Sequence, residues 1–171
     1  MPAYEQMATH LETERLTLRP WADTDAEELR ALFAERGNGT PTAEESRRDV
    51  EVLREREAAA GVSLLAMVRR EEGDFIGYCG LVVGRSTVEE PEIAYELLRR
   101  VHGHGYATEA ARAVVAAAAA TGRTRLWSTT RPENKPSLRV LEKTGFTYHR
   151  TTQDERGDVV WLTRSLTGGA G

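Results

Sequence analysis

The strongest constraint on the fold is a glycine-rich turn that separates a strand pattern from a helix pattern. Residues 92–98 alternate polar and apolar side chains, as a half-buried strand does. Gly103 and Gly105 follow, and the next segment repeats apolar residues at the spacing of one helical face until Gly122, a typical helix-ending glycine. The apolar helix positions are Ala107, Ala110, Ala111, Val114, Val115 and Ala118. The turn therefore brings the unpaired backbone N–H groups of a helix start beside two residues without side chains.

This turn predicts a binding site for a phosphate group, because helix-start N–H groups and the helix dipole both favour an anion. A glycine turn without any ligand is the alternative, and only the strand–turn–helix context argues against it. Two nucleotide-binding patterns do not fit. A P-loop needs Gly-Lys-Ser/Thr where this chain has Gly105-Tyr106-Ala107, and a dinucleotide fingerprint needs a third small residue where Thr108 stands. A different phosphate-bearing ligand is required.

Periodicity along the rest of the chain predicts one α/β (α+β) domain over residues 11–166, with flexible ends at residues 1–10 and 167–171. Thr42 is expected to cap a helix, with Glu45 completing a capping box. The expected strands are residues 15–20, 62–68, 75–83, 92–98, 125–130, 146–150 and 159–164, and the expected helices are residues 24–36, 42–60, 107–121 and 134–144. The order is β-α-α-β-β-β-α-β-α-β-β, a mixed central sheet of about seven strands with about four helices.

The composition limits the function classes. The chain has 171 residues, 40% of them hydrophobic and 29% charged, which is typical of a globular domain with a substantial core. A formal net charge of −4 argues against sequence-independent binding of nucleic acid. Cys79 is the only cysteine and lies in an apolar run, so we expect no disulfide, no thiolate metal cluster and no nucleophilic role. The first ten residues lack an apolar signal region, and no stretch approaches the roughly 18 apolar residues of a membrane span. We therefore expect a cytoplasmic protein without membrane contact.

Three segments, in the right order, resemble the GNAT superfamily of N-acetyltransferases. The phosphate loop of that family reads Gln/Arg-x-x-Gly-x-Gly/Ala before a long helix, and it is matched by His102-Gly103-His104-Gly105-Tyr106-Ala107 with His102 as one departure. A register that starts at Arg100 and ends at Gly105 matches without departure. The three segments resemble, more narrowly, the branch that includes the ribosomal-protein N-terminal acetyltransferases; they are residues 11–19, 105–110 and 131–146.

The resemblance implies a GNAT fold that binds acetyl-coenzyme A (acetyl-CoA) as the acyl donor. The strand at residues 92–98 would splay from the strand at residues 125–130, and pantetheine would lie in the gap. The implied cofactor-binding residues are Leu97, Leu98 and Arg99 for the pantetheine arm, and His102, Gly103, His104, Gly105, Tyr106, Ala107 and Thr108 for the pyrophosphate. Asn134 matches an asparagine that hydrogen-bonds the cofactor arm, although it is also a good helix N-cap.

Acetyl transfer to an amine needs an unprotonated amine, a stabilised oxyanion and a protonated leaving thiolate. The resemblance places Ser137 near the thioester sulfur, although serine in a first helical turn needs no function. Backbone N–H near Leu97 would serve the oxyanion. Glu92 and Glu96 point to one face of their strand, and Glu92 is the candidate general base, with a solvated strand face as the alternative. Tyr95 is expected to pack the sheet.

The acceptor is expected to be a primary amine, either a protein N-terminus or a small molecule. A non-catalytic module that binds acyl-CoA is the alternative function. Family relatives are often dimers, so a homodimer is consistent with the sequence. His102 and His104 lie two residues apart without carboxylate or thiolate partners, so no metal is expected. The first two helices, where the family varies its substrate, carry no motif that identifies the amine.

Overall fold

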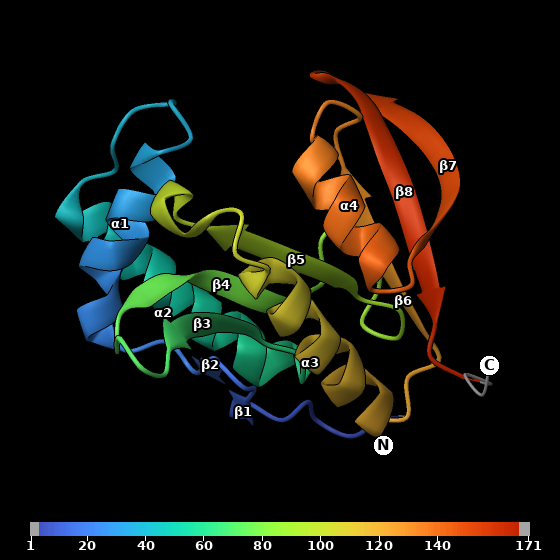
Figure 1. Cartoon of the computed structure of the whole chain (residues 1–171), viewed down its shortest axis with the longest axis horizontal. Helices are drawn as coiled ribbons and strands as arrows, with labels where there is room; N and C mark the ends of the chain where they lie inside the picture. Colours follow the sequence, from blue (N-terminus) through green and yellow to red (C-terminus); the bar gives the residue numbers. More distant parts are fainter. Residues whose placement is uncertain (1–3, 168–171) are drawn as a thin grey trace.

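The computed structural model describes residues 4–167, which form one mixed sheet with helices on both faces (Figure 1). The strands are β1 (Leu11–Glu12), β2 (Leu16–Arg19), β3 (Leu64–Arg69), β4 (Phe75–Val82), β5 (Glu92–Leu97), β6 (Arg125–Thr130), β7 (Thr147–Asp154) and β8 (Gly157–Ser165). The α-helices are α1 (Ala26–Ala34), α2 (Ala43–Ala60), α3 (Tyr106–Ala120) and α4 (Lys135–Lys143), and the 3-10 helices are η1 (Asp23–Asp25) and η2 (Arg99–Val101). The predicted fold class and element order are confirmed. The additional strand, β1, has two residues, too few for periodicity to reveal.

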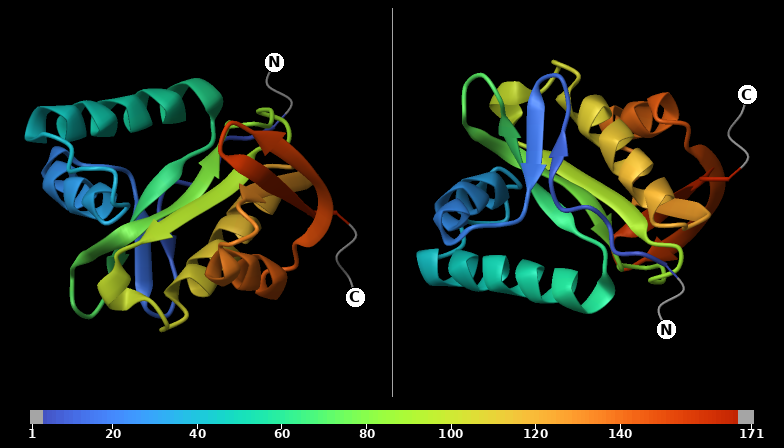
Figure 2. Two further views of the ribbon diagram at one scale, coloured as in Figure 1. Left: turned by 90° about the horizontal axis from the view of Figure 1, so that it is seen from above. Right: turned by 90° about the horizontal axis from the view of Figure 1, so that it is seen from below.

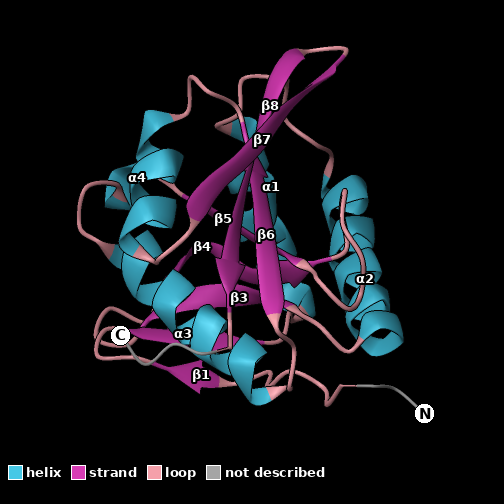
Figure 3. Cartoon of the chain, turned by 90° about the vertical axis from the view of Figure 1, so that its right-hand side faces the viewer, coloured by secondary structure: helices cyan, strands magenta, loops and turns pink. Residues whose placement is uncertain are grey.

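The sheet order is β1-β2-β3-β4-β5-β6-β8-β7. Every neighbouring pair is antiparallel except β5 and β6, which run parallel and are joined in the sequence through α3. The β7–β8 hairpin lies beside β6 and completes this end of the sheet (Figure 3). The parallel pair thus lies in the middle of the sheet, where a site between two strands is shielded by elements on either side.

The helices divide between the two faces of the sheet. Figure 2 shows α1 and α2 on one face, and α3 and α4 on the other. The contact face of α3 is built from small residues: Ala110, Ala111, Val114 and Ala118 are fully buried. Because alanine projects little beyond the helix backbone, α3 can lie close to β4 and β5, which it contacts. The start of α3 is thereby fixed against the end of β5.

Local signals account for the ends of α2. The Thr42 side chain accepts a hydrogen bond from the Glu45 N–H at 3.1 Å, which confirms the predicted cap. Gly61 ends the helix at φ +69°, a left-handed conformation that glycine adopts without strain. The helix therefore begins and ends where its sequence dictates.

The N-terminal segment is anchored where it is described. The Glu5 N–H donates to the Thr121 carbonyl oxygen at 3.0 Å, and the Met7 N–H donates to the Gly61 carbonyl oxygen at 2.9 Å. Met7 is buried in the core. These contacts attach the described residues of this segment to the core. Residues 1–3 and 168–171 lie outside the described part. Within residues 4–167, no helix is long and apolar enough to cross a bilayer.

Candidate functional site

A cavity of about 550 Å³ lies between the end of β5, the start of α3 and the start of α4. The sequence-predicted residues that line it are Leu97, Arg99, His102, Gly103, Gly105, Tyr106, Ala107, Thr108, Asn134 and Ser137. These residues come from segments up to 40 positions apart, and the fold brings them to one place. Leu98, His104 and Glu92 do not line the cavity.

The glycine turn has the backbone form of an anion site. Gly103 has φ +80° and Gly105 has φ +81°, and Gly105 is the N-cap of α3. Both values lie in the region that favours glycine, so the turn could not be built readily from residues with side chains. Gly105, Tyr106, Ala107 and Thr108 all line the cavity, at the end of α3 where backbone N–H groups have no partner within the helix. The positive end of the helix dipole faces the same space.

The structure favours the later of the two loop registers. Arg100 donates to the Asp74 carboxylate at 2.6 Å and to the Phe75 carbonyl oxygen at 3.1 Å, and it does not line the cavity. His102 does line the cavity, and its Nε2 donates to the Leu97 carbonyl oxygen at 2.8 Å. The Arg100 side chain therefore binds the β3–β4 hairpin, and the loop that faces the cavity begins at His102.

β5 and β6 separate after a single paired position. Glu92 is opposite Trp127, and the Trp127 N–H donates to the Pro91 carbonyl oxygen at 3.0 Å. Successive residues of a strand direct their N–H and C=O groups to alternate sides. Since the Ile93 carbonyl oxygen faces Ser128 of β6, the backbone groups of Tyr95 and Leu97 face the widening gap. In the part of β5 that the structure describes, neither residue is paired with β6.

The three residues predicted for the pantetheine arm differ in availability. Leu97 directs its backbone N–H into the gap, as the preceding alternation requires. The Leu98 N–H is used in the sheet, since it donates to the Ile76 carbonyl oxygen at 2.8 Å. The Arg99 N–H donates to the Glu35 carboxylate at 2.9 Å. A ligand in the gap therefore meets the backbone of Tyr95 and Leu97 first, and it reaches Arg99 only if Glu35 moves.

Ser137 lies beside a tyrosine that the sequence assigned to packing. The Tyr95 hydroxyl donates to the Ser137 carbonyl oxygen at 3.0 Å, and its oxygen lies 3.1 Å from Ser137 Oγ. Burial raises the pKa of Tyr95 well above its ordinary value, so the phenol keeps its proton. Tyr95 also lines the cavity. The signal for it was the strand alternation, which places Ile93, Tyr95 and Leu97 on the face that carries α3 and α4.

Asn134 acts as a helix N-cap, which is one of the two roles expected for it. Its side-chain oxygen accepts a hydrogen bond from the Ser137 N–H at 3.3 Å, which makes it the N-cap of α4. The Asn134 side chain is exposed and lines the cavity, and its amide nitrogen makes no hydrogen bond within residues 4–167. Capping therefore leaves the amide donors available to a ligand.

The two glutamates of β5 have different surroundings. Glu92 is 5% exposed, and its carboxylate accepts hydrogen bonds from the Arg85 N–H and, at 2.6 Å, from the Thr129 hydroxyl. Glu96 lines the cavity, pairs with Arg36 on both oxygens and accepts a hydrogen bond from the Tyr78 hydroxyl at 2.8 Å. The structure thus separates Glu92, the expected base, from the other site residues, because the loop after β4 and a side chain of β6 enclose it.

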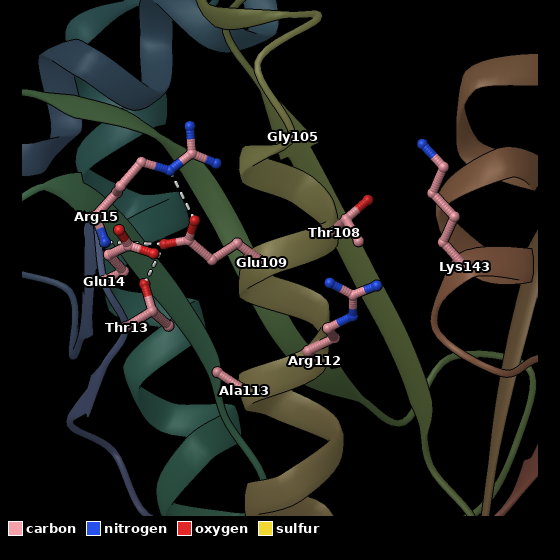
Figure 4. Close-up of a pocket in the computed structure, with 9 residues that line it drawn as sticks. All are labelled: Thr13, Glu14, Arg15, Gly105, Thr108, Glu109, Arg112, Ala113 and Lys143. Atoms are coloured by element: carbon pink, nitrogen blue, oxygen red, sulfur yellow. Dashed lines mark hydrogen bonds and ion pairs between the residues drawn. The ribbon is translucent and has the colours of Figure 1, made fainter.

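A second hollow, of about 840 Å³, adjoins the cavity along the outer side of α3 (Figure 4). Gly105, Thr108 and Lys143 line both spaces. Figure 4 shows the cationic ends of Arg112 and Lys143 on the same side of α3 as the Thr108 hydroxyl. Arg139 on α4 lines the first cavity. Within residues 4–167, Arg112, Arg139 and Lys143 form no ion pair. Three cationic side chains without an ion-pair partner therefore border the space in front of the glycine turn. Their positions in the sequence do not predict this arrangement.

The remaining titratable residues do not form a separate centre. His104 packs its ring against Tyr106, with 5.9 Å between ring centroids, and does not face the cavity. Cys79 is fully buried, and burial raises the pKa of its thiol, in keeping with the expected inert role. Among the described residues, no group of three or more histidine, cysteine, aspartate or glutamate side chains is arranged to hold a metal ion.

Comparison with known proteins gives a family match over most of the chain. Residues 15–147 match the family described as "Acetyltransferase (GNAT) domain". The uncharacterized protein YkkB of Bacillus subtilis (strain 168) is 33% identical over 153 residues, which cover 84% of this chain and 88% of YkkB.

Solved acetyltransferase structures have the same fold. An acetyltransferase from Agrobacterium tumefaciens superposes with a TM-score of 0.78 at 28% identity, covering 92% of this chain and 94% of that one. RimL, the ribosomal L7/L12 alpha-N-protein acetyltransferase solved in complex with coenzyme A, superposes with a TM-score of 0.81 at 16% identity, covering 91% of this chain and 97% of RimL. At these identities, the likeness to RimL shows a shared fold.

Proposed function

The chain belongs to the GNAT acetyltransferase family, and from that membership we propose that this acyltransferase moves an acetyl group from acetyl-CoA directly to a primary amine. The amine is a protein N-terminus or a small molecule. The observation that carries the proposal is the cavity where the unpaired edge of β5, the glycine turn before α3 and the Ser137–Tyr95 pair meet. Those three features supply the contacts that a thioester donor and its reaction require.

The cavity fits the donor in charge and shape. The amides at residues 105–108 suit a pyrophosphate, because they are unpaired and stand at the positive end of α3. Arg112, Arg139 and Lys143 supply positive charge for the remaining phosphate of coenzyme A. The gap between β5 and β6 suits the pantetheine arm, whose amides would pair with the backbone of Tyr95 and Leu97. Asn134 would hydrogen-bond the same arm through its free amide group.

The leaving thiolate and the oxyanion have separate candidate groups. As the amine attacks the thioester carbonyl, the carbon–sulfur bond breaks and the sulfur takes the electron pair. We assign the proton for sulfur to the Ser137 hydroxyl, which then takes the proton of the Tyr95 phenol 3.1 Å away, and solvent in the cavity reprotonates the phenol. The Leu97 N–H, directed into the gap, would stabilise the oxyanion.

The attacking amine also has to lose a proton, and Glu96 is better placed to receive it than Glu92. Glu96 lines the cavity, and its side chain is 24% exposed although it pairs with Arg36, whereas Glu92 is 5% exposed and does not line the cavity. Glu35 and Arg36, at the end of α1, line the same part of the cavity. We therefore propose that the acceptor enters from the side of α1, with Glu96 as the proton acceptor, directly or through water.

Thiol release from acetyl-CoA tests the proposal. The wild-type protein would be assayed with N-terminal peptides, polyamines and other small amines, and the release rate would be compared with that in the absence of an acceptor. An acetyltransferase gives amine-dependent release and an acetylated product detectable by mass spectrometry. Binding of coenzyme A without turnover for any amine would instead identify a non-catalytic acyl-CoA-binding module.

A further inference from the structure

Arg15 and Glu109 join the beginning of the chain to the first turn of α3. Arg15 lies between β1 and β2, and Glu109 lies 94 residues later. The Arg15 Nε donates to Glu109 Oε1 at 2.7 Å, and the Arg15 backbone N–H donates to Glu109 Oε2 at 2.9 Å. The Thr13 hydroxyl also donates to Glu109 Oε2. Three donor atoms of residues 13–15, a segment remote from Glu109 in the sequence, thus fix one carboxylate (Figure 4).

The same guanidinium also holds the glycine turn. Arg15 Nη1 donates to the His104 carbonyl oxygen at 2.9 Å. In a planar trans peptide the C=O and N–H groups point in opposite directions. Because the His104 carbonyl is directed toward Arg15, the Gly105 N–H of the same peptide points away from Arg15. Gly105 lines the cavity, so this contact orients a backbone donor for the anion site.

The ring of Tyr106 completes the contact. The Arg15 guanidinium carbon lies 4.3 Å from the centroid of the Tyr106 ring, and Tyr106 is only 9% exposed. Gly103 and Gly105 have no side chains with which to restrain the turn, and glycine loses more conformational freedom on ordering than any other residue. Arg15 supplies this restraint from outside the turn, through one backbone contact and one ring contact.

We propose that the Arg15–Glu109 pair is a positioning device that keeps the phosphate-binding turn in its binding conformation before the donor arrives. The inference rests on the proposed use of that turn for the pyrophosphate of coenzyme A. Glu109 orients the guanidinium fork, and the fork orients the peptide between His104 and Gly105. Neither side chain takes part in the chemical step. Donor affinity depends on the pair because the turn is then ordered in advance rather than during binding.

Two conservative variants separate positioning from a direct attraction between Arg15 and phosphate. Arg15→Lys keeps the charge but loses the planar fork that reaches Glu109 and His104 together. Glu109→Gln removes a negative charge close to the donor phosphates. If Arg15 acted as a charge, Arg15→Lys would be neutral and Glu109→Gln would tighten binding. If the pair positions the turn, both variants weaken binding, so the sign of the Glu109→Gln effect is decisive.

The experiment measures coenzyme A affinity by calorimetry and donor KM and kcat by thiol release for the wild type, both variants and the double variant. We expect each single variant to weaken affinity and raise donor KM about tenfold, with kcat at saturating donor unchanged. The double variant should bind coenzyme A as tightly as each single variant does, because either substitution alone already removes the positioning contact. Glu27→Gln, which removes one carboxylate of the surface pair with Arg30, is the matched control and should leave affinity unchanged.

Hydrogen exchange gives a readout that does not involve the donor. Without ligand, the amides of residues 103–106 should exchange faster in Arg15→Lys and Glu109→Gln than in the wild type or in Glu27→Gln. Unchanged exchange and unchanged affinity in variants of a wild type that does bind coenzyme A would overturn the positioning role. Tighter binding by Glu109→Gln would overturn it as well. A wild type that fails to bind coenzyme A would instead reject the proposed function.

Discussion

Glu92 and Glu96 lie on one face of β5, and replacing each by glutamine should produce opposite phenotypes. Glu92 is 5% exposed and accepts hydrogen bonds from the Arg85 N–H and the Thr129 hydroxyl. A glutamine there has one acceptor oxygen and no charge, so the two charge-assisted hydrogen bonds from Arg85 and Thr129 cannot both be kept. Such a loss costs about 1–3 kcal/mol. For a chain of this length, we expect Glu92→Gln to lower Tm by about 2–12 °C.

Glu96→Gln should affect catalysis and leave stability nearly unchanged. The Glu96 and Arg36 side chains are 24% and 44% exposed, and ion pairs this accessible contribute at most about 1 kcal/mol. If Glu96 accepts the proton of the amine, its loss should reduce kcat by about 10²–10⁴. Glu92→Gln, assayed below its Tm, should keep kcat within a few-fold of the wild type.

Thermal unfolding and thiol-release kinetics on the same preparations check both expectations. The two variants act as controls for each other, because they make the same chemical change about 13 Å apart on one strand. The assignment would be refuted by a Glu92→Gln protein that melts like the wild type but has lost turnover, together with a Glu96→Gln protein that remains fully active.

Three further changes test other parts of the molecule. Gly105→Glu should abolish the thermal stabilisation by coenzyme A, because it adds bulk and negative charge at the amides. The control variant Gly39→Glu, at another left-handed glycine with nothing within 4 Å of the added Cβ, should still be stabilised by coenzyme A. The double variant Arg112→Ala/Lys143→Ala should weaken binding of coenzyme A more than binding of 3′-dephospho-coenzyme A in titration calorimetry, and equal weakening of both ligands would contradict contact with that phosphate. Hydrogen bonding to Arg69, with a further contribution from Arg100, lowers the pKa of Asp74 to about 2. The stability that the ionised Asp74 contributes is therefore complete above the pKa of the unfolded chain, near 3.9, and is lost as pH falls through about 2. Asp74→Asn should therefore lower the free energy of unfolding at pH 7 and have a diminishing effect toward pH 2, as followed by denaturant titration; an effect independent of pH would rule out this cause.

The sequence by itself determined most of the elements and the glycine turn before α3. The alternation in residues 92–98, Gly103 and Gly105 before an apolar helix, and Thr42 with Glu45 are local signals. Each acts over a few residues through backbone geometry, so each can be recognised without knowledge of the remaining chain. The same signals placed Glu92 and Glu96 correctly on one face of β5.

The tertiary structure decided what surrounds each of those side chains. Periodicity assigns Glu92 and Glu96 to a face but does not specify that Thr129 encloses one while Arg36 meets the other at the cavity. The contact between Arg15 and Glu109 was equally hidden, because it joins positions 94 residues apart. Burial, hydrogen-bond partners and pKa values depend on segments that only folding brings together. For that reason the sequence located the glycine turn before α3, whereas the surroundings of Glu92 and Glu96 and the contacts of Arg15 with the turn became apparent only in the folded chain.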